Sequence, residues 1–176
     1  MHETDAPVDR SFMVQCCEQW EQVVDEVATL GIRTVKLRIG VVLAKEGGAL
    51  AEFVKPLRFG LGAYFGNGKA WYSWIHRDDL CRAFIWALDH PDVAGVYNAV
   101  APQPARIKAL VEATARARQK PALILPAPAF AMRLLFGEMA AVILNSNHIS
   151  AKKIQQAGFE FQYPALDGAL KAIFQP

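Results

Sequence analysis

The densest group of polar and aromatic side chains lies between Trp74 and Asp79, where a short apolar segment leads into an expected helix. His76 could donate a proton or contact a ligand there, because its unperturbed pKa of ~6.5 lies near neutrality. A structural role is the alternative. Asp78 or Asp79 directly before an amphipathic helix is typical of an N-cap, which contributes ~1 kcal/mol, and Trp74 is typical of strand packing.

Two other sets of residues include reactive types but lack the context that their chemistry needs. Ser73, His76 and Asp79 could suggest a hydrolase triad, but no nucleophile elbow accompanies them, and residues this close in sequence rarely converge. Cys16 and Cys17 have acidic neighbours, which disfavour a negatively charged sulfur, so we expect no reactive thiolate. The third cysteine is distant, which gives neither a disulfide framework nor metal-ligand spacing.

Glycines are concentrated between Gly60 and Gly68, but the pattern is not that of a dinucleotide-binding turn. Such a turn follows a buried strand and opens a helix, whereas this segment leads into the aromatic residues 71–74. A flexible hairpin is the better interpretation.

The bulk composition limits the partners. The chain has 176 residues, of which 53% are hydrophobic and 20% charged, as in one globular domain or a domain plus a lobe. A net charge of +2 with dispersed Lys and Arg argues against nucleic acid. Arg133 and Glu138 interrupt the most apolar stretch, 121–144, and the N-terminus has no apolar signal region. We therefore expect no membrane contact and a cytoplasmic location.

Apolar periodicity predicts an α/β chain. Residues 11–30 have the spacing of an amphipathic helix, and residues 32–44 have the pattern of a strand whose second half is buried on both faces, as in a parallel sheet. Further strands are expected at 72–76, 95–100, 122–125 and 158–163, and further helices at 49–58, from Asp78 or Asp79 to 90, 107–118, 129–144, 150–157 and 166–174.

An ordered series of short motifs resembles the second half of an extended short-chain dehydrogenase/reductase, more narrowly of the nucleotide-sugar-epimerase-like family. These motifs are Arg38-x-Gly40-x-Val42-Leu43, Gly47-Gly48-Ala49-Leu50, Ser73-Trp74-Ile75-His76-x-Asp78-Asp79-Leu80 and Gly95-x-Tyr97-Asn98. The tail resembles the small C-terminal domain of unknown function appended to that family, through Leu125-Pro126-x-Pro128 and Ala157-Gly158-Phe159-x-Phe161-x-Tyr163-Pro164.

The resemblance implies the second half of a Rossmann-like doubly wound parallel sheet plus a small α/β C-terminal lobe. Residues 1–101 would be the C-terminal half of the NAD(P)-binding domain, with a substrate-lobe segment at 46–75, and residues 102–176 would be the small domain. The glycine-rich turn that seats the pyrophosphate belongs to the preceding half of such proteins and is absent here. NAD or NADP is therefore expected in the intact protein, and tight binding to this chain is not.

The resemblance also implies site residues. Arg38, Ile39 and Gly40 would lie near the nicotinamide and the substrate, at the carboxyl end of a parallel strand. The alternative is that Arg38 is a structural ion-pair partner and Gly40 a close-packing position. Trp74 and His76 would contact the substrate.

The catalytic residues of the superfamily have no counterpart in this chain. The positions of its Tyr and Lys fall on Met13 and Cys17, and neither side chain can perform those roles. We therefore expect the C-terminal portion of an NAD(P)-dependent epimerase/dehydratase-like oxidoreductase that is not competent alone. Its substrate would be nucleotide-sugar-like or another small polar molecule. A non-catalytic binding or interaction module is the alternative.

The truncation that the resemblance implies has a consequence for the strand at 34–43. In extended relatives this strand has neighbours on both sides, one of them from the preceding half. Its open apolar edge, with only Lys36 and Arg38 as charged gatekeepers, would favour self-association.

Overall fold

The computed structural model describes residues 1–5, 11–127 and 146–175. The helix predicted at 129–144 lies outside these residues. The described elements are helices interspersed with strands, and three of the four strand pairs are parallel, so the α/β prediction is confirmed.

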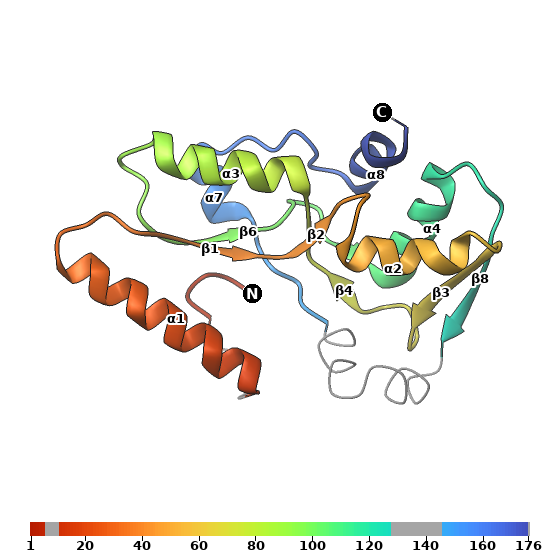
Figure 1. The fold of residues 1–176 in the computed structure, drawn as a ribbon, viewed down its shortest axis with the longest axis horizontal. Helices are drawn as coiled ribbons and strands as arrows, with labels where there is room; N and C mark the ends of the chain where they lie inside the picture. Colours follow the sequence, from red (N-terminus) through yellow and green to blue (C-terminus); the bar gives the residue numbers. More distant parts are fainter. Residues whose placement is uncertain (6–10, 128–145, 176) are drawn as a thin grey trace.

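The central strands run end to end. β1 (Val35–Ile39) pairs in parallel with β6 (Gly95–Ala99), and β2 (Val41–Leu43) pairs in parallel with β5 (Trp74–His76). The strand predicted at 32–44 is thus two strands with different partners (Figure 1). Among the described residues no strand pairs with the second edge of β1.

Gly40 is where the chain changes partner. Its N–H donates to the carbonyl of Ala99, the last residue of β6, and the next N–H, of Val41, donates to the carbonyl of Ser73, directly before β5. A Cβ on Gly40 would lie 2.7 Å from the Ser73 carbonyl oxygen and 2.7 Å from Cγ1 of Val100. Only glycine leaves room for the three segments to meet here.

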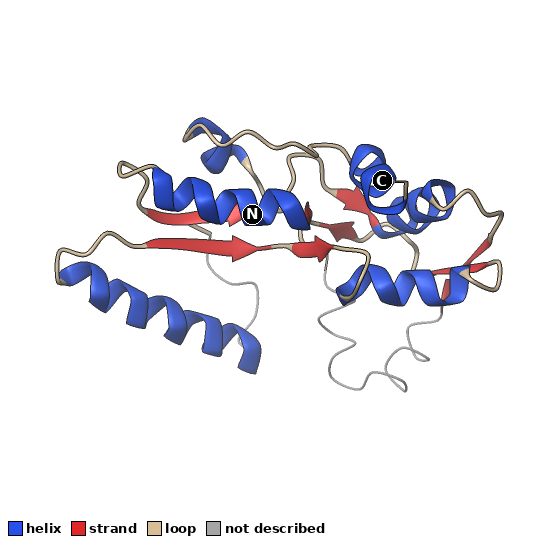
Figure 2. Ribbon diagram, turned by 45° about the horizontal axis from the view of Figure 1, so that its top comes forward, coloured by secondary structure: helices blue, strands red, loops and turns tan. Residues whose placement is uncertain are grey.

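Helices cover both sides of β1. α1 (Phe12–Thr29) and α3 (Arg77–Asp89) lie on opposite faces, as Figure 2 shows. α1 confirms the predicted amphipathic helix, yet none of its residues is buried, and Trp20 is 72% exposed. Ion pairs hold it to β1, among them Asp25 with Lys36 at 2.8 Å.

A second group of elements lies beyond β2. It contains α2 (Gly48–Leu57), β3 (Leu61–Phe65), β4 (Trp71–Tyr72), β7 (Ala105–Arg106), α4 (Ile107–Ala117), β8 (Leu123–Ala127) and α8 (Leu166–Phe174). β3 pairs in parallel with β8, a strand some 60 residues later in the chain. The prediction of a hairpin for the glycine-rich segment is therefore wrong.

The main core joins this group to the central strands. Its fully buried members include Leu43, Leu50, Trp74, Leu110 and Leu170. These residues come from both sides of the domain boundary that the sequence predicts at 101–102. The boundary itself stays a prediction. A second cluster packs α3 and β6 against α7 (Lys152–Gln156) and Phe159.

The strand predicted at 158–163 is wrong. The segment is irregular, and its amides at 162 and 163 bond to a side chain of α3 instead of a strand. None of the helices that the structure describes is long and apolar enough to cross a membrane.

We expect Gly40→Ala to lower the free energy of unfolding by about 1–3 kcal/mol, because the added methyl group overlaps a backbone carbonyl and a core valine. Urea denaturation would measure the loss. Gly168→Ala is the matched control. Gly168 lies within α8, and a Cβ there meets nothing within 4 Å, so the variant should be as stable as the unmodified protein or more stable, because alanine favours a helix over glycine. Equal stability of the two variants would contradict the packing role of Gly40.

Candidate functional site

The end of β1 carries the residues predicted to face a cofactor. The guanidinium of Arg38 is held in bidentate fashion by Glu21, with Nε 2.7 Å from Oε1 and Nη2 2.8 Å from Oε2. Its Nη1 donates to the carbonyl of Glu3. The hydrogen bond from Arg38 lowers the pKa of Glu21, and the same bond raises the pKa of Arg38.

This geometry matches the structural alternative for two of the three residues. Arg38 ties β1 to α1, and Gly40 is a close-packing position. Ile39 between them is 48% exposed, so its side chain is open to a ligand. Contact of this strand end with a cofactor stays a prediction.

His76 ends β5 and begins α3. It is 4% exposed, and its Nδ1 accepts the backbone N–H of Asp78 at 3.1 Å, which makes His76 the N-cap of the helix. The prediction that Asp78 or Asp79 caps this helix is therefore wrong. The helix begins earlier than expected, and both aspartates lie within its first turn.

Asp79 instead binds the C-terminal segment. Its carboxylate is fully buried and accepts the backbone N–H of Gln162 and of Tyr163, each at 2.8 Å. Arg82 donates a third hydrogen bond at 3.1 Å. Charge-assisted bonds of this kind each contribute ~1.5–3 kcal/mol, so Asp79 holds residues 162 and 163 firmly against α3.

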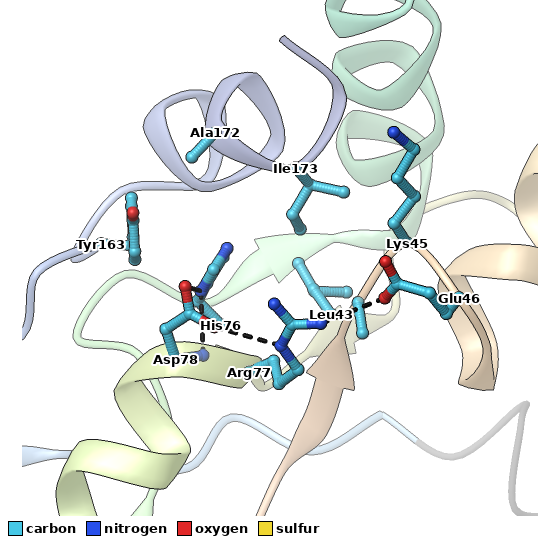
Figure 3. A pocket seen from close by; sticks show the side chains of 10 residues that line it. Leu43, Lys45, Glu46, His76, Arg77, Asp78, Tyr163, Ala172 and Ile173 are labelled. Carbon is cyan, nitrogen blue, oxygen red and sulfur yellow. Dashed lines mark hydrogen bonds and ion pairs between the residues drawn. The ribbon is translucent and has the colours of Figure 1, made fainter. Parts of the chain in front are cut away.

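That attachment places the Tyr163 ring on His76, with ring centroids 4.0 Å apart. The two rings border a cavity of about 210 Å³ (Figure 3). The cavity is also lined by Leu43 at the end of β2 and residues 44–46 after it, by Arg77 and Asp78 of α3, and by Ala172 and Ile173 of α8.

The second ring nitrogen of His76, Nε2, is buried and has no hydrogen-bond partner in the described structure. Since Nδ1 accepts a hydrogen bond, the neutral ring carries its proton on Nε2, which is then a donor. Burial lowers the pKa of His76, and the carboxylates of Asp78 and Asp79 oppose this without reversing it. The ring is therefore neutral at pH 7.

The other residues singled out in the sequence have structural roles. Trp74 is fully buried, and its Nε1 donates to the carbonyl of Gln103. Ser73 donates to the Asn147 carbonyl and accepts from the Ile149 amide, so the hydrogen bonds of Ser73 and Asp79 lead to different segments and no triad forms. The substrate contacts predicted for Trp74 and His76 stay predictions.

Metal binding finds no support in the part of the chain that is described, where no three His, Cys, Asp or Glu side chains are grouped around one point. Cys16, Cys17 and Cys81 are free thiols.

Sequence reasoning missed Tyr163, which faces His76 from 87 positions away. Its only signal was the Tyr163-Pro164 pair in the tail motif. Arg77 was also missed, although it directly follows His76. It bonds Asp78 and Glu46, both at 3.1 Å, at the rim of the cavity.

Comparison with known proteins places these features in a family. Residues 21–100 match the NAD dependent epimerase/dehydratase family, and residues 127–173 match a domain of unknown function (DUF1731). The chain is 36% identical over 171 residues to an Arabidopsis thaliana protein named "Epimerase family protein SDR39U1 homolog, chloroplastic", covering 97% of this chain and 49% of that protein. It is 37% identical to an epimerase family protein of Staphylococcus aureus, covering 93% of this chain and 54% of that one.

Solved structures agree. Human epimerase family protein SDR39U1 (isoform 2), crystallised with NADPH, superposes with a TM-score of 0.88 at 30% identity, covering 99% of this chain and 59% of that one. Thermus thermophilus UDP-glucose 4-epimerase in complex with NAD shares the fold, with a TM-score of 0.71 at 18% identity and coverage of 98% and 55%. The chain spans about half the length of the curated relatives that it matches.

We expect acid to destabilise the protein through His76. Its pKa lies below the ordinary 6.5, so below pH 6.5 the unfolded chain binds a proton that the folded ring binds less readily. The stability that the neutral His76 ring contributes is therefore fully present above pH 6.5, and it is lost as the pH falls from there through the pKa of the folded ring. The groups that face the ring are Asp78, Asp79, Arg77 and Tyr163, with Lys45 and Glu46 across the cavity.

Urea denaturation between about pH 7.5 and about pH 5.5 would measure this loss. His76→Asn, whose Oδ1 can still accept the Asp78 amide, should show a flatter profile than the unmodified chain. His148→Asn, at an exposed histidine, should keep the original slope. Equal slopes in both variants would rule out His76 as the cause.

Proposed function

Because the chain belongs to the NAD dependent epimerase/dehydratase family and carries the appended DUF1731 domain, we propose that it is the C-terminal portion of an NAD(P)-dependent oxidoreductase. Its fold is Rossmann-like, with parallel strands flanked by helices. The observation that carries the proposal is the similarity, over 99% of this chain, to a human relative crystallised with NADPH. The proposed substrate is nucleotide-sugar-like or another small polar molecule.

The strand end at residues 38–40 is the proposed contact with cofactor and substrate. In open parallel sheets, ligands bind beyond the carboxyl ends of the strands where the strand order changes. Gly40 lies where the chain passes from its pairing with β6 to its pairing with β5, and the half-exposed side chain of Ile39 precedes it. Arg38 contributes by fixing this strand to α1, through Glu21.

A non-catalytic binding or interaction module is the second candidate. Met13 and Cys17 occupy the positions of the superfamily's Tyr and Lys, and neither can transfer the proton. The buried Asp79 is bound to the backbone and so is not available as a general base. These observations favour a role in binding over an independent catalytic role for these 176 residues.

The compartment remains a prediction. A cytoplasmic location is expected from the sequence, while one relative is named as chloroplastic.

Cofactor titration tests the proposal. The purified chain should bind neither NADH nor NADPH with a Kd below about 100 μM, because the pyrophosphate-binding turn belongs to the other half of the fold. A chain extended by a nucleotide-binding half should bind one of them, and Ile39→Glu in that extended chain should weaken binding about tenfold, since it places a negative charge at the strand end. Tryptophan fluorescence would report both results.

Leu61→Glu is the matched control, because Leu61 is also 48% exposed and lies on a strand, but in β3, away from the strand end. It should leave the Kd unchanged. Failure of the extended chain to bind either dinucleotide would sink the oxidoreductase proposal and leave the binding module.

Self-association is also proposed, through the unpaired edge of β1. One face of the same strand is covered by α1, and Phe12, Trp20 and the neighbouring Leu30 are each more than 70% exposed. An open edge next to apolar surface favours pairing with another copy. Sedimentation velocity at micromolar concentration should show dimers or larger species, whereas a well-folded monomer throughout would contradict this expectation.

A further inference from the structure

The cavity beside His76, which we call the His76 cavity, is separate from the strand end of the proposed function. On this side its lining is Leu43, the last residue of β2, and residues 44–46 after it, and four residues of extended chain from Gly40 to Ala44 span ~13 Å. Its volume of about 210 Å³ is below the ~300–1,000 Å³ of sites for drug-sized ligands. A nucleotide sugar is therefore too large for it.

One wall carries a donor that lacks an acceptor. His76 is only 4% exposed, and its Nε2–H has no partner among the described residues. Figure 3 shows this nitrogen facing the space between Tyr163 and Ile173. A buried donor without a partner destabilises the folded chain, and a ligand with an oxygen acceptor would remove that penalty.

A second donor faces the same space. Arg77 uses Nε to bond Asp78 and Nη1 to bond Glu46, whereas its Nη2 makes no hydrogen bond within the described residues and points toward the His76 ring in Figure 3. His76 and Arg77 thus bring two free N–H groups to the lining of one cavity, one of them on a cation, and such a pair suits the two oxygens of a carboxylate. Lys45 adds positive charge at the rim.

The remaining walls select among anions. Leu43, Ala172, Ile173 and the Tyr163 ring form an apolar side that suits a short hydrocarbon chain. The carboxylates of Glu46 and Asp78 also line the cavity. They disfavour a doubly charged ligand such as phosphate more than a singly charged one, because like charges repel.

We propose that the His76 cavity binds the carboxylate of a short aliphatic acid, with the oxygens on His76 Nε2 and Arg77 Nη2 and the hydrocarbon chain against Ile173 and Tyr163. This site goes beyond the proposed function, because it needs neither a dinucleotide nor the strand end. It involves no covalent step.

Calorimetric titration of the purified 176-residue chain with butyrate, and separately with inorganic phosphate, tests the proposal. Butyrate should bind with one site per chain, and phosphate at least about tenfold more weakly. His76→Asn keeps an acceptor for the Asp78 amide but removes the donor at the position of Nε2, and should weaken butyrate about tenfold or more. His148→Asn is the control and should bind butyrate as the unmodified chain does.

Arg77→Gln is the second variant, since Arg77 is 54% exposed in its side chain and its replacement leaves the core intact even if His76→Asn does not fold. It should also weaken butyrate about tenfold. In nitrogen-15 NMR of the histidine rings, the protonated Nε2 of His76 should shift on addition of butyrate. Absence of saturable butyrate binding, equal or tighter phosphate binding, or undiminished butyrate binding by Arg77→Gln would overturn the proposal.

Discussion

The buried carboxylate of Asp79 is the interaction on which the arrangement around His76 depends. It lies in the first turn of α3 and accepts hydrogen bonds from the backbone amides of residues 162 and 163, so it joins α3 to the C-terminal segment. Without the carboxylate these two amides would lose their acceptor, and each unsatisfied buried donor costs ~1–3 kcal/mol. These hydrogen bonds hold the backbone of Tyr163 where its ring contacts the ring of His76.

The packing of Tyr163 in turn positions the C-terminal helix. The chain passes from Tyr163 into α8, where Leu170 is fully buried in the core with Leu43 and Trp74. Ile173 of the same helix reaches the cavity beside His76. A polar contact at Asp79 and an apolar core at α8 thus act on the same segment, and between them the donor on His76 Nε2 is held in a defined position.

Gly40 imposes the second constraint, at the opposite end of β2. Because no side chain fits there, β1 and β2 can form one path while pairing with different strands. Packing is uneven around this point. Beyond β2 the core is closed, whereas α1 has no buried residue and one edge of β1 has no partner among the described strands. The curated relatives that the chain matches are about twice as long.

The sequence by itself determined the features that depend on local order along the chain. The apolar spacing of residues 11–30 predicted α1, the β-branched segment at 32–44 predicted a strand of a parallel sheet, and the ordered motifs predicted the family. These predictions succeed because helix periodicity and strand alternation are properties of neighbouring residues. The assignment of the family's Tyr and Lys positions to Met13 and Cys17 also comes from the sequence alone, and it stays a prediction.

Only the tertiary structure decided which residue meets which. β3 pairs with β8 instead of forming a hairpin, the segment at 158–163 bonds to Asp79 instead of a strand, and His76 caps the helix that the aspartates were expected to cap. Each outcome depends on a partner that is distant in sequence or on the residue at which a helix begins. Local propensity does not specify such partners, because they are selected by the burial and hydrogen bonding of the whole chain.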